Sequence, residues 1–188
     1  MPRRIRYQVA ASLDGCIAGP NGEADWIIMD PEIDFGELFN QFDTLLMGRG
    51  TFESMVRQQG RAAMPGMKII VVSRTLNQKD YPDVTIMGEP SKELLTALRN
   101  ERGKDIWLFG GGSLFRSLLE IGMVDTVEIA VIPVLLGGGI PLLPTPAART
   151  KLKLTGHRVY KNSGIVLLEY AVEYTALRKP TKKKRPAP

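Results

Sequence analysis

The stretch Ile106-Trp107-Leu108-Phe109-Gly110-Gly111-Gly112-Ser113-Leu114-Phe115 decides how this chain is organised. Its four apolar residues are typical of a buried strand, and the run from Leu114 to Ile121 has helical spacing. The glycines between them predict a tight strand-to-helix turn. Such a turn aims free N–H groups and a positive helix end at one point, which an anion can approach closely. The stretch therefore predicts either a seat for a cofactor's phosphates or a glycine turn without a ligand. Its spacing is not that of the usual dinucleotide-binding G-x-G-x-x-G turn.

Length and composition indicate one folded domain. The chain has 188 residues, of which 44% are hydrophobic, and this is enough for a packed core. Cys16 is the single cysteine, so no internal disulfide can form and we expect a cytoplasmic protein. No apolar run approaches the length of about 18 residues that spans a bilayer, and no signal peptide is indicated.

The positive charge of the chain is concentrated at its C-terminal end. Residues 175–188 contain no acid and six bases, which are Arg178, Lys179, Lys182, Lys183, Lys184 and Arg185. The formal net charge is +5, so removal of these six charges leaves −1 for residues 1–174. We therefore predict one domain over residues 1–174 and a basic, disordered tail over 175–188. The near-neutral domain argues against a nucleic-acid partner.

Strand and helix patterns alternate through most of the chain, which predicts an α/β sandwich with a mostly parallel sheet. A helix should begin at Pro31, with Asp30 as its cap and Ile33, Leu38, Phe39 and Phe42 on its buried side. Two final strands joined at Asn162-Ser163-Gly164 predict an antiparallel hairpin at the sheet edge. We predict strands over 4–11, 44–47, 68–72, 84–87, 106–109, 126–134, 151–160 and 165–174, and further helices over 51–58, 92–102 and 114–121.

Polar and glycine residues follow several of these strands directly. Ala10 ends the first strand, Gly48-Arg49 and Ser73-Arg74 end two others, and Gly110 opens the glycine turn. Ligands of parallel sheets bind at the carboxyl ends of the strands, so these residues could line one crevice. Arginine suits phosphate because it stays charged and binds two oxygens. The sequence therefore predicts a ligand with several phosphates, although each arginine alone could be a solvated strand-end residue.

Other chemistries have little support in the sequence. His157 is the only histidine, so a histidine-based triad or a multi-histidine metal site is not expected. We predict no metal site and read Cys16 as a small packed residue rather than a nucleophile. No Walker A sequence is present.

Several motifs resemble those of dihydrofolate reductases. Met47-Gly48-Arg49-Gly50-Thr51-Phe52-Glu53-Ser54 is similar to their M-G-R-x-T-[WFY]-E-S segment, Val71–Thr75 to their second cofactor strand, and Phe109–Gly112 to their glycine turn. Ser12-Leu13-Asp14-Gly15 and Pro133–Gly139 resemble a narrower group, the reductase domain of bifunctional riboflavin-biosynthesis enzymes and its stand-alone relatives. The resemblance runs from about residue 5 to residue 174.

The resemblance implies a three-layer dihydrofolate-reductase-like fold and NADPH as cofactor. In such a protein the M-G-R segment and the Ser-Arg pair hold cofactor phosphates, which here implies Gly48, Arg49, Thr51, Ser73 and Arg74. The glycine turn would cradle the pyrophosphate, usually with a cis Gly-Gly bond, through Gly110, Gly111, Gly112, Ser113 and Leu114. Ala10 and Ile17 would pack near the nicotinamide.

The sequence departs from the family pattern around the substrate. Met67 stands where folate enzymes keep an arginine, and Cys16 stands where riboflavin-pathway reductases usually have lysine. Acids occupy positions 30, 32 and 34, where those reductases carry basic residues. Asp34 is our candidate for proton supply, with Asp30 and Glu32 as close alternatives. All three could instead be ordinary acids favoured by a helix N-terminus.

The sequence thus predicts an NADPH-dependent reductase that transfers hydride to a small heterocycle, either a pterin or a riboflavin-pathway pyrimidine. The alternative is a nucleotide-binding protein that keeps the NADPH seat without catalysis. We expect a small-molecule substrate, no membrane or nucleic-acid partner, and a homodimer as a candidate assembly.

Overall fold

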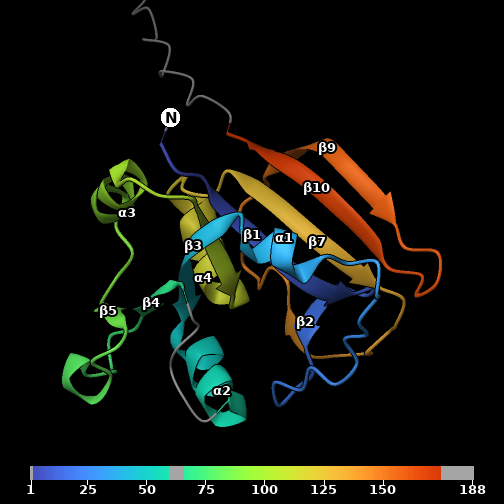
Figure 1. Ribbon diagram of the computed structural model, residues 1–188, viewed down its shortest axis with the longest axis horizontal. Helices are drawn as coiled ribbons and strands as arrows, with labels where there is room; N and C mark the ends of the chain where they lie inside the picture. Colours follow the sequence, from blue (N-terminus) through green and yellow to red (C-terminus); the bar gives the residue numbers. More distant parts are fainter. Residues whose placement is uncertain (1, 60–65, 175–188) are drawn as a thin grey trace, which may run out of the picture.

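The computed structural model describes residues 2–59 and 66–174, which form one eight-stranded sheet with helices on both faces (Figure 1). The strand order is β5-β4-β3-β6-β1-β7-β10-β9. The strands are β1 (Ile5–Ser12), β3 (Phe42–Gly48), β4 (Lys68–Val72), β5 (Thr85–Met87), β6 (Asp105–Gly110), β7 (Thr126–Ile132), β9 (Lys151–Val159) and β10 (Val166–Glu173). From β5 to β7 all neighbours are parallel, and β10 runs antiparallel to both β7 and β9. The predicted mostly parallel sheet with an antiparallel C-terminal hairpin is therefore confirmed.

Two separate cores give the molecule its three layers. Helices α3 (Lys92–Asn100) and α4 (Gly112–Glu120) pack on one face through residues such as Leu95 and Phe115. Helix α2 (Arg49–Gln59) packs on the opposite face through Phe52 and Met55, together with Leu38 of α1 (Phe35–Phe39). Among the described residues, no helix is long and apolar enough to cross a membrane.

The first helix begins later than the sequence predicted. Asp30 does not cap a helix at Pro31, because its carboxylate accepts the N–H of Glu32 and holds a turn. Such local side-chain bonds compete with helix formation. The helix α1 starts one turn later, with Asp34 as its cap, and none of its residues is fully buried. Phe42 does not belong to it but opens β3 and stacks on Trp107, with ring centroids 5.0 Å apart.

A small second sheet lies in segments where the sequence predicted no strand. The strand β2 (Cys16–Ala18) pairs with β8 (Ile140–Pro141). Asp14 fixes this region, since its carboxylate accepts the N–H groups of Leu136 and Gly137 at 3.1 and 2.8 Å. This contact joins the Ser12–Gly15 motif to the 133–139 motif, which are more than a hundred residues apart.

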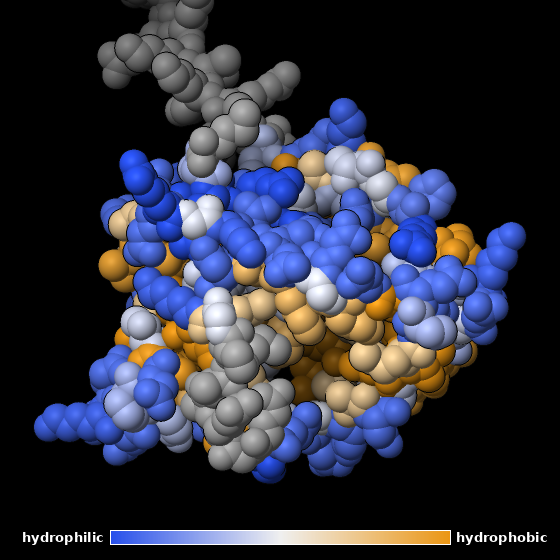
Figure 2. All heavy atoms as spheres, viewed as in Figure 1, coloured by the Kyte–Doolittle hydropathy of each residue, from blue (hydrophilic) through white to orange (hydrophobic). Residues whose placement is uncertain are grey.

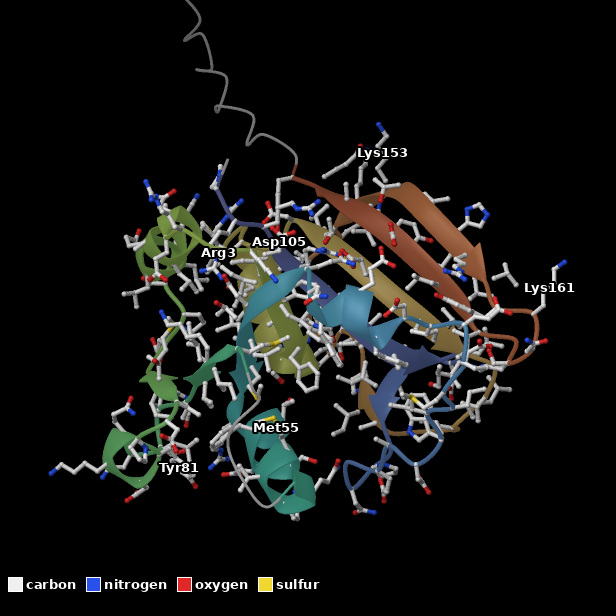
Figure 3. The ribbon with its side chains drawn as sticks, in the orientation of Figure 1. Arg3, Met55, Tyr81, Asp105, Lys153 and Lys161 are labelled. Atoms are coloured by element: carbon white, nitrogen blue, oxygen red, sulfur yellow. The ribbon has the colours of Figure 1, made fainter. Side chains whose placement is uncertain are left out.

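The two ends of the sheet carry different chemistry. Arg3 and Asp105 lie at the amino ends of β1 and β6, and Met55 of α2 lies toward the opposite end (Figure 3). Arg4 and Asp105 form an ion pair at 2.7 Å that ties β1 to β6 at the amino end. The motif residues lie at the carboxyl ends of β3, β4 and β6. Residues 175–188, predicted to be a disordered tail, lie outside the described residues.

Candidate functional site

The motif residues of three strands meet at one edge of the sheet. In the register of the parallel strands, Gly48 lies beside Val72, and Met47 lies beside Gly110. Gly48-Arg49, Ser73-Arg74 and the glycine turn therefore follow neighbouring strands at the same edge. The strand order β4-β3-β6 brings together segments that are spread over more than sixty residues of sequence.

Two helix N-termini converge at this edge. The helix α2 begins at Arg49 and α4 begins at Gly112. A Cβ atom built on Gly110 or Gly111 would lie 3.4–3.5 Å from the side chain of Thr51, so the first turns of the two helices are in contact range. Gly111 caps α4 without a side-chain hydrogen bond. The N–H groups at the start of a helix need acceptors, and an anion here could supply them.

Glycine is required at two positions of the turn for different structural reasons. Gly111 has a φ of +88°, a conformation that side chains other than glycine rarely adopt. A Cβ on Gly112 would lie 2.5 Å from the carbonyl oxygen of Pro141, so this glycine is needed for packing against the end of β8. The cis Gly-Gly bond implied by the family resemblance is not present, because Thr145–Pro146 is the one cis bond in the described chain. The positive φ of Gly111 makes the turn with a trans peptide.

The two arginines of the edge remain accessible. The Arg74 side chain is 78% exposed and its closest acid is Glu89, at 3.4 Å. The Arg49 side chain is 54% exposed and donates to Thr75 Oγ1 at 3.3 Å. Such exposed ion pairs are weak and give way readily to a ligand. Ser73 is buried, and its Oγ accepts the N–H groups of Thr75 and Leu76, so it shapes the turn that carries Arg74. Thr75 ends the Val71–Thr75 motif, and its contact with Arg49 adds it to this cluster, a role that the sequence did not indicate.

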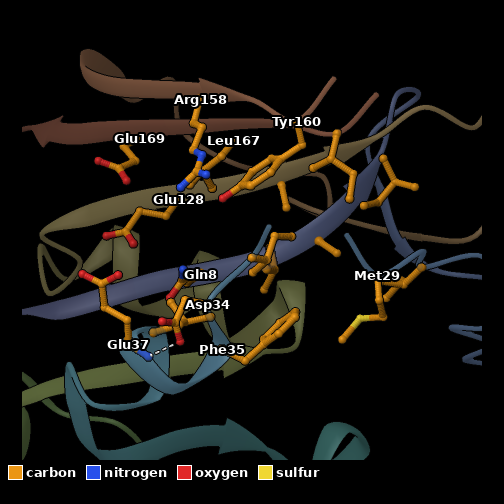
Figure 4. Close-up of a pocket in the computed structure, with 18 of the residues that line it drawn as sticks. Gln8, Met29, Asp34, Phe35, Glu37, Glu128, Arg158, Tyr160, Leu167 and Glu169 are labelled. Carbon is orange, nitrogen blue, oxygen red and sulfur yellow. Dashed lines mark hydrogen bonds between the residues drawn. The ribbon is translucent and has the colours of Figure 1, made fainter. Parts of the chain in front are cut away.

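A pocket of about 490 Å³ opens between α1 and the β1–β7–β10 part of the sheet (Figure 4). Its apolar wall includes Ala10, Ile33, Phe35, Ile132 and Leu167. Figure 2 shows a hollow with hydrophobic walls on this side of the molecule. Ala10 lies in β1, the strand next to β6, so the pocket adjoins the strand that ends in the glycine turn. Ile17 lies in β2 and does not line the pocket.

The other wall of the pocket is rich in carboxylates. Glu128 is 4% exposed and receives two hydrogen bonds from Arg6, at 2.7 and 2.6 Å. Burial alone would lower the pKa of Arg6, but the bonds and charges of Glu128 and Asp105 outweigh burial and raise it. Glu37 and Glu169 also line the pocket, and neither forms an ion pair within the described part of the chain. The charged lining is therefore negative overall.

Of the three acids considered near the first helix, Asp34 is the one that lines the pocket. One carboxylate oxygen accepts the N–H of Glu37 at 2.8 Å, and the residue is exposed at the pocket's edge. Asp30 is buried and Glu32 is exposed, and neither is part of the lining. Cys16 is buried, as expected for a packed residue, and also lies outside the lining.

Comparison with known proteins decides the family. The family described as the RibD C-terminal domain matches residues 3–166. The chain belongs to this family. Among curated relatives of this RibD C-terminal domain protein, YyaP of Bacillus subtilis (strain 168) is 37% identical over 179 residues, which are 89% of this chain and 94% of YyaP. The riboflavin biosynthesis protein RibD of Mycobacterium tuberculosis is 27% identical over 151 residues, which are 72% of this chain and 44% of RibD.

Solved structures support the same fold. Dihydrofolate reductase from Enterococcus faecalis, complexed with NADP(H), superposes with a TM-score of 0.66 at 20% identity, covering 91% of this chain and 97% of the enzyme. The expected dihydrofolate-reductase-like fold is thus confirmed, and the RibD C-terminal domain here has a reductase-type fold. No group of three or more potential metal ligands lies close together among its described residues.

Sequence reasoning missed most of the polar pocket wall of this RibD C-terminal domain. A signal was present, since Arg6, Glu128 and Glu169 interrupt strands that are otherwise rich in apolar residues. A charge at an inward position of a strand is unusual and marks either a buried pair or a site. Tyr160 and Arg158 carried no such signal, because they lie at the end of an edge strand whose residues are mostly exposed.

Proposed function

We propose that this protein is an NADPH-dependent reductase that transfers hydride to a small heterocyclic substrate. The observation that carries the proposal is that two sites adjoin each other. One is the seat, with two helix N-termini and two exposed arginines, and the other is the pocket, which Ala10 lines on the neighbouring strand. NADPH would supply the hydride. Two comparisons support this choice of cofactor: the match to the RibD C-terminal domain family, and the similar fold of a dihydrofolate reductase that was solved with NADP(H).

In this proposal the chain holds the cofactor by main-chain and charged contacts. The N–H groups of Gly111, Gly112, Ser113 and Leu114 would bind the pyrophosphate, with Gly110 and Gly48 leaving room for it. Arg49 and Thr51 would bind a phosphate beside the start of α2, and Ser73 and Arg74 the 2′-phosphate. Ala10 would pack against the nicotinamide, and Ile17 would border it from β2. The cradle fits, because a Cβ on Gly111 would point at Thr51 across the seat.

The substrate side of the proposal follows from charge. The pocket lining holds Asp34, Glu37, Glu128 and Glu169 against Arg6 and Arg158. A substrate that is neutral or cationic near α1 is therefore favoured over an anionic one. Pterins and riboflavin-pathway pyrimidines are the classes of planar heterocycle that we propose. Asp34 would supply the proton, since among Asp30, Glu32 and Asp34 it is the one that lines the pocket.

The experiment combines binding with turnover. Calorimetry with NADPH and NADH measures the seat, and loss of NADPH absorbance with a panel of pterins and pyrimidines measures catalysis. The reductase proposal requires NADPH binding together with turnover of at least one member of the panel. Tight NADPH binding without turnover of any member would instead favour the alternative, a nucleotide-binding protein without catalysis. Failure to bind NADPH would contradict both.

We also propose a homodimer that uses the outer strand β9. Leu152, Leu154 and Val159 of this strand are 42%, 51% and 54% exposed, and exposed apolar edge strands are sites of association. Light scattering on a sizing column should give twice the monomer mass for the wild type. Leu154→Lys should shift the protein toward monomer, and a monomeric wild type would contradict the proposal.

A further inference from the structure

Tyr160 is held rigidly at the wall of the pocket. It is 5% exposed and packs in a cluster with Ile132 and Ile165. Its N–H donates to the Ile165 carbonyl at 2.9 Å, and its own carbonyl accepts the N–H of Gly164 at 2.8 Å. The backbone and the ring are therefore both fixed, so the hydroxyl group has a defined position.

The hydroxyl group of Tyr160 points into the pocket and has no hydrogen-bond partner among the described residues (Figure 4). Arg158 does not supply one, since its guanidinium lies 4.6 Å from the centre of the ring and also reaches Glu32 at 3.7 Å. Nearby in the same lining, the side-chain oxygen of Gln8 is buried and unpaired. Buried polar groups nearly always have partners, so the unpaired Gln8 oxygen points to a ligand beside the open Tyr160 hydroxyl.

Packing alone does not explain a tyrosine at this position. Phenylalanine would fill the same space, so the hydroxyl group is the feature that packing leaves unexplained. The ring packs against Ile132 and Ile165 and lies under the Arg158 guanidinium, and its hydroxyl faces the pocket. The feature that tyrosine adds is a hydrogen-bond donor placed above the floor formed by β1 and β7.

We propose that the Tyr160 hydroxyl donates a hydrogen bond to an acceptor atom of the substrate, and that the Gln8 side-chain amide pairs with a neighbouring edge of the same molecule. This assignment rests on the proposed reductase function. It narrows the substrate to a planar nitrogen heterocycle that has a ring nitrogen or carbonyl acceptor and carries no anionic group against Glu37, Glu128 and Glu169. Tyr160 is thus a specificity-determining residue that lies far in sequence from the cofactor motifs.

The test is the single-atom change Tyr160→Phe, with Tyr170→Phe as the matched control. Tyr170 lies on the neighbouring strand β10, does not line the pocket, and alternates with Glu169, which does. The probes are pterin and 6-aminouracil, titrated by calorimetry into the protein saturated with NADPH. We expect Tyr160→Phe to weaken the tighter-binding probe about three- to tenfold, as for one neutral hydrogen bond. NADPH affinity should stay unchanged, and the melting temperature should stay equal or rise.

The outcomes separate this inference from the proposed function. If NADPH does not bind the wild type, the proposed function fails by itself. If NADPH binds but Tyr160→Phe binds both probes as tightly as the wild type, or if neither probe binds the wild type, the role of Tyr160 is wrong. An equal loss of probe affinity in Tyr170→Phe would also overturn it, because the effect would then not belong to the pocket.

Discussion

Among single residues, Arg74 gives the sharpest test of cofactor choice. Its side chain is largely free in solvent and follows Ser73 at the edge of the proposed seat. If it binds the 2′-phosphate, Arg74→Ala should weaken NADPH binding by about ten- to a hundredfold and leave NADH binding nearly unchanged, because a charge-assisted hydrogen bond is lost. Titration of both cofactors by calorimetry measures this. Lys79→Ala, at another exposed base, serves as the control, and equal losses for the two cofactors would contradict the assignment.

A substitution at Gly111 tests whether the glycine turn binds the cofactor through its backbone. Any side chain at a φ of +88° is strained by about 1–3 kcal/mol, and valine would also fill the approach to the turn. Gly111→Val should therefore abolish NADPH binding. Gly88→Val is the matched control, since Gly88 has open space around it and no positive φ. Circular dichroism checks folding, and a folded Gly111→Val protein with normal NADPH affinity would show that the seat lies elsewhere.

At the scale of elements, the contact that Asp14 makes between the Ser12–Gly15 and 133–139 motifs should weaken at low pH. The Ser12 hydroxyl and the N–H groups of Leu136 and Gly137 lower the pKa of Asp14. A carboxylate whose pKa is lower in the folded state stabilises the fold at every pH above its unfolded-state pKa of about 3.9. This stabilisation is lost as the pH falls through the folded-state pKa. Asp14→Asn should thus destabilise the protein at pH 7 and differ less from the wild type in acid.

Urea unfolding of both proteins at pH 7 and at about pH 3 measures this difference. Asp25→Asn is the control, because Asp25 lies in the same exposed part of the chain and forms no hydrogen bond or ion pair with the described residues. A gap between wild type and Asp14→Asn that stays constant with pH would mean that the carboxylate charge plays no part in joining the loops.

For the whole molecule, the charge of the pocket predicts substrate choice. Dihydrofolate carries a glutamate tail, and Met67, which stands where folate enzymes keep an arginine, packs against the α2-side core instead. Loss of one charge-assisted contact corresponds to about ten- to a hundredfold in affinity, so dihydrofolate should turn over poorly. The phosphorylated pyrimidine should also be poor, because acids line the pocket side of α1.

Steady-state kinetics with dihydrofolate, a dihydropterin without the glutamate, and the phosphorylated pyrimidine measure this preference. Arg57 and Arg61 are the bases that could restore the missing charge; Arg57 is exposed on α2 and Arg61 lies outside the described residues. Efficient use of either anionic compound would therefore show the charge argument to be wrong, and Arg57→Ala would then test the first of these two bases.

A second prediction for the whole molecule concerns whether the basic segment 175–188 contributes to stability or to cofactor binding. Truncation after Tyr174 should leave the melting temperature and NADPH affinity nearly unchanged, because the sequence beyond it has no apolar stripe that could dock. Differential scanning calorimetry and cofactor titration of the shortened protein measure both. A large fall in either would mean that the segment belongs to the fold or to the site.

The sequence by itself determined the features that depend on neighbours along the chain. Strand and helix alternation, the glycine turn before α4 and the antiparallel hairpin at residues 151–174 all follow from local patterns of apolar, glycine and turn residues. The predicted start of α1 was wrong because Asp30 and Asp34 are both competent caps. The Asp30 carboxylate instead holds a turn at Glu32, and Asp34 caps the helix.

Only the tertiary structure decided which side chains face the pocket. Its polar wall joins Arg6 of β1, Glu37 of α1, Glu128 of β7 and Glu169 of β10, with Tyr160 just beyond β9. Which of these side chains turn inward depends on strand order and register, and a register shift of one residue would reverse the faces of a strand. The residues proposed for the cofactor seat stand out as motifs because they follow the ends of their strands. Arg6, Glu128 and Glu169 of the pocket lie within strands, where only the order and register of the sheet set the direction of a side chain.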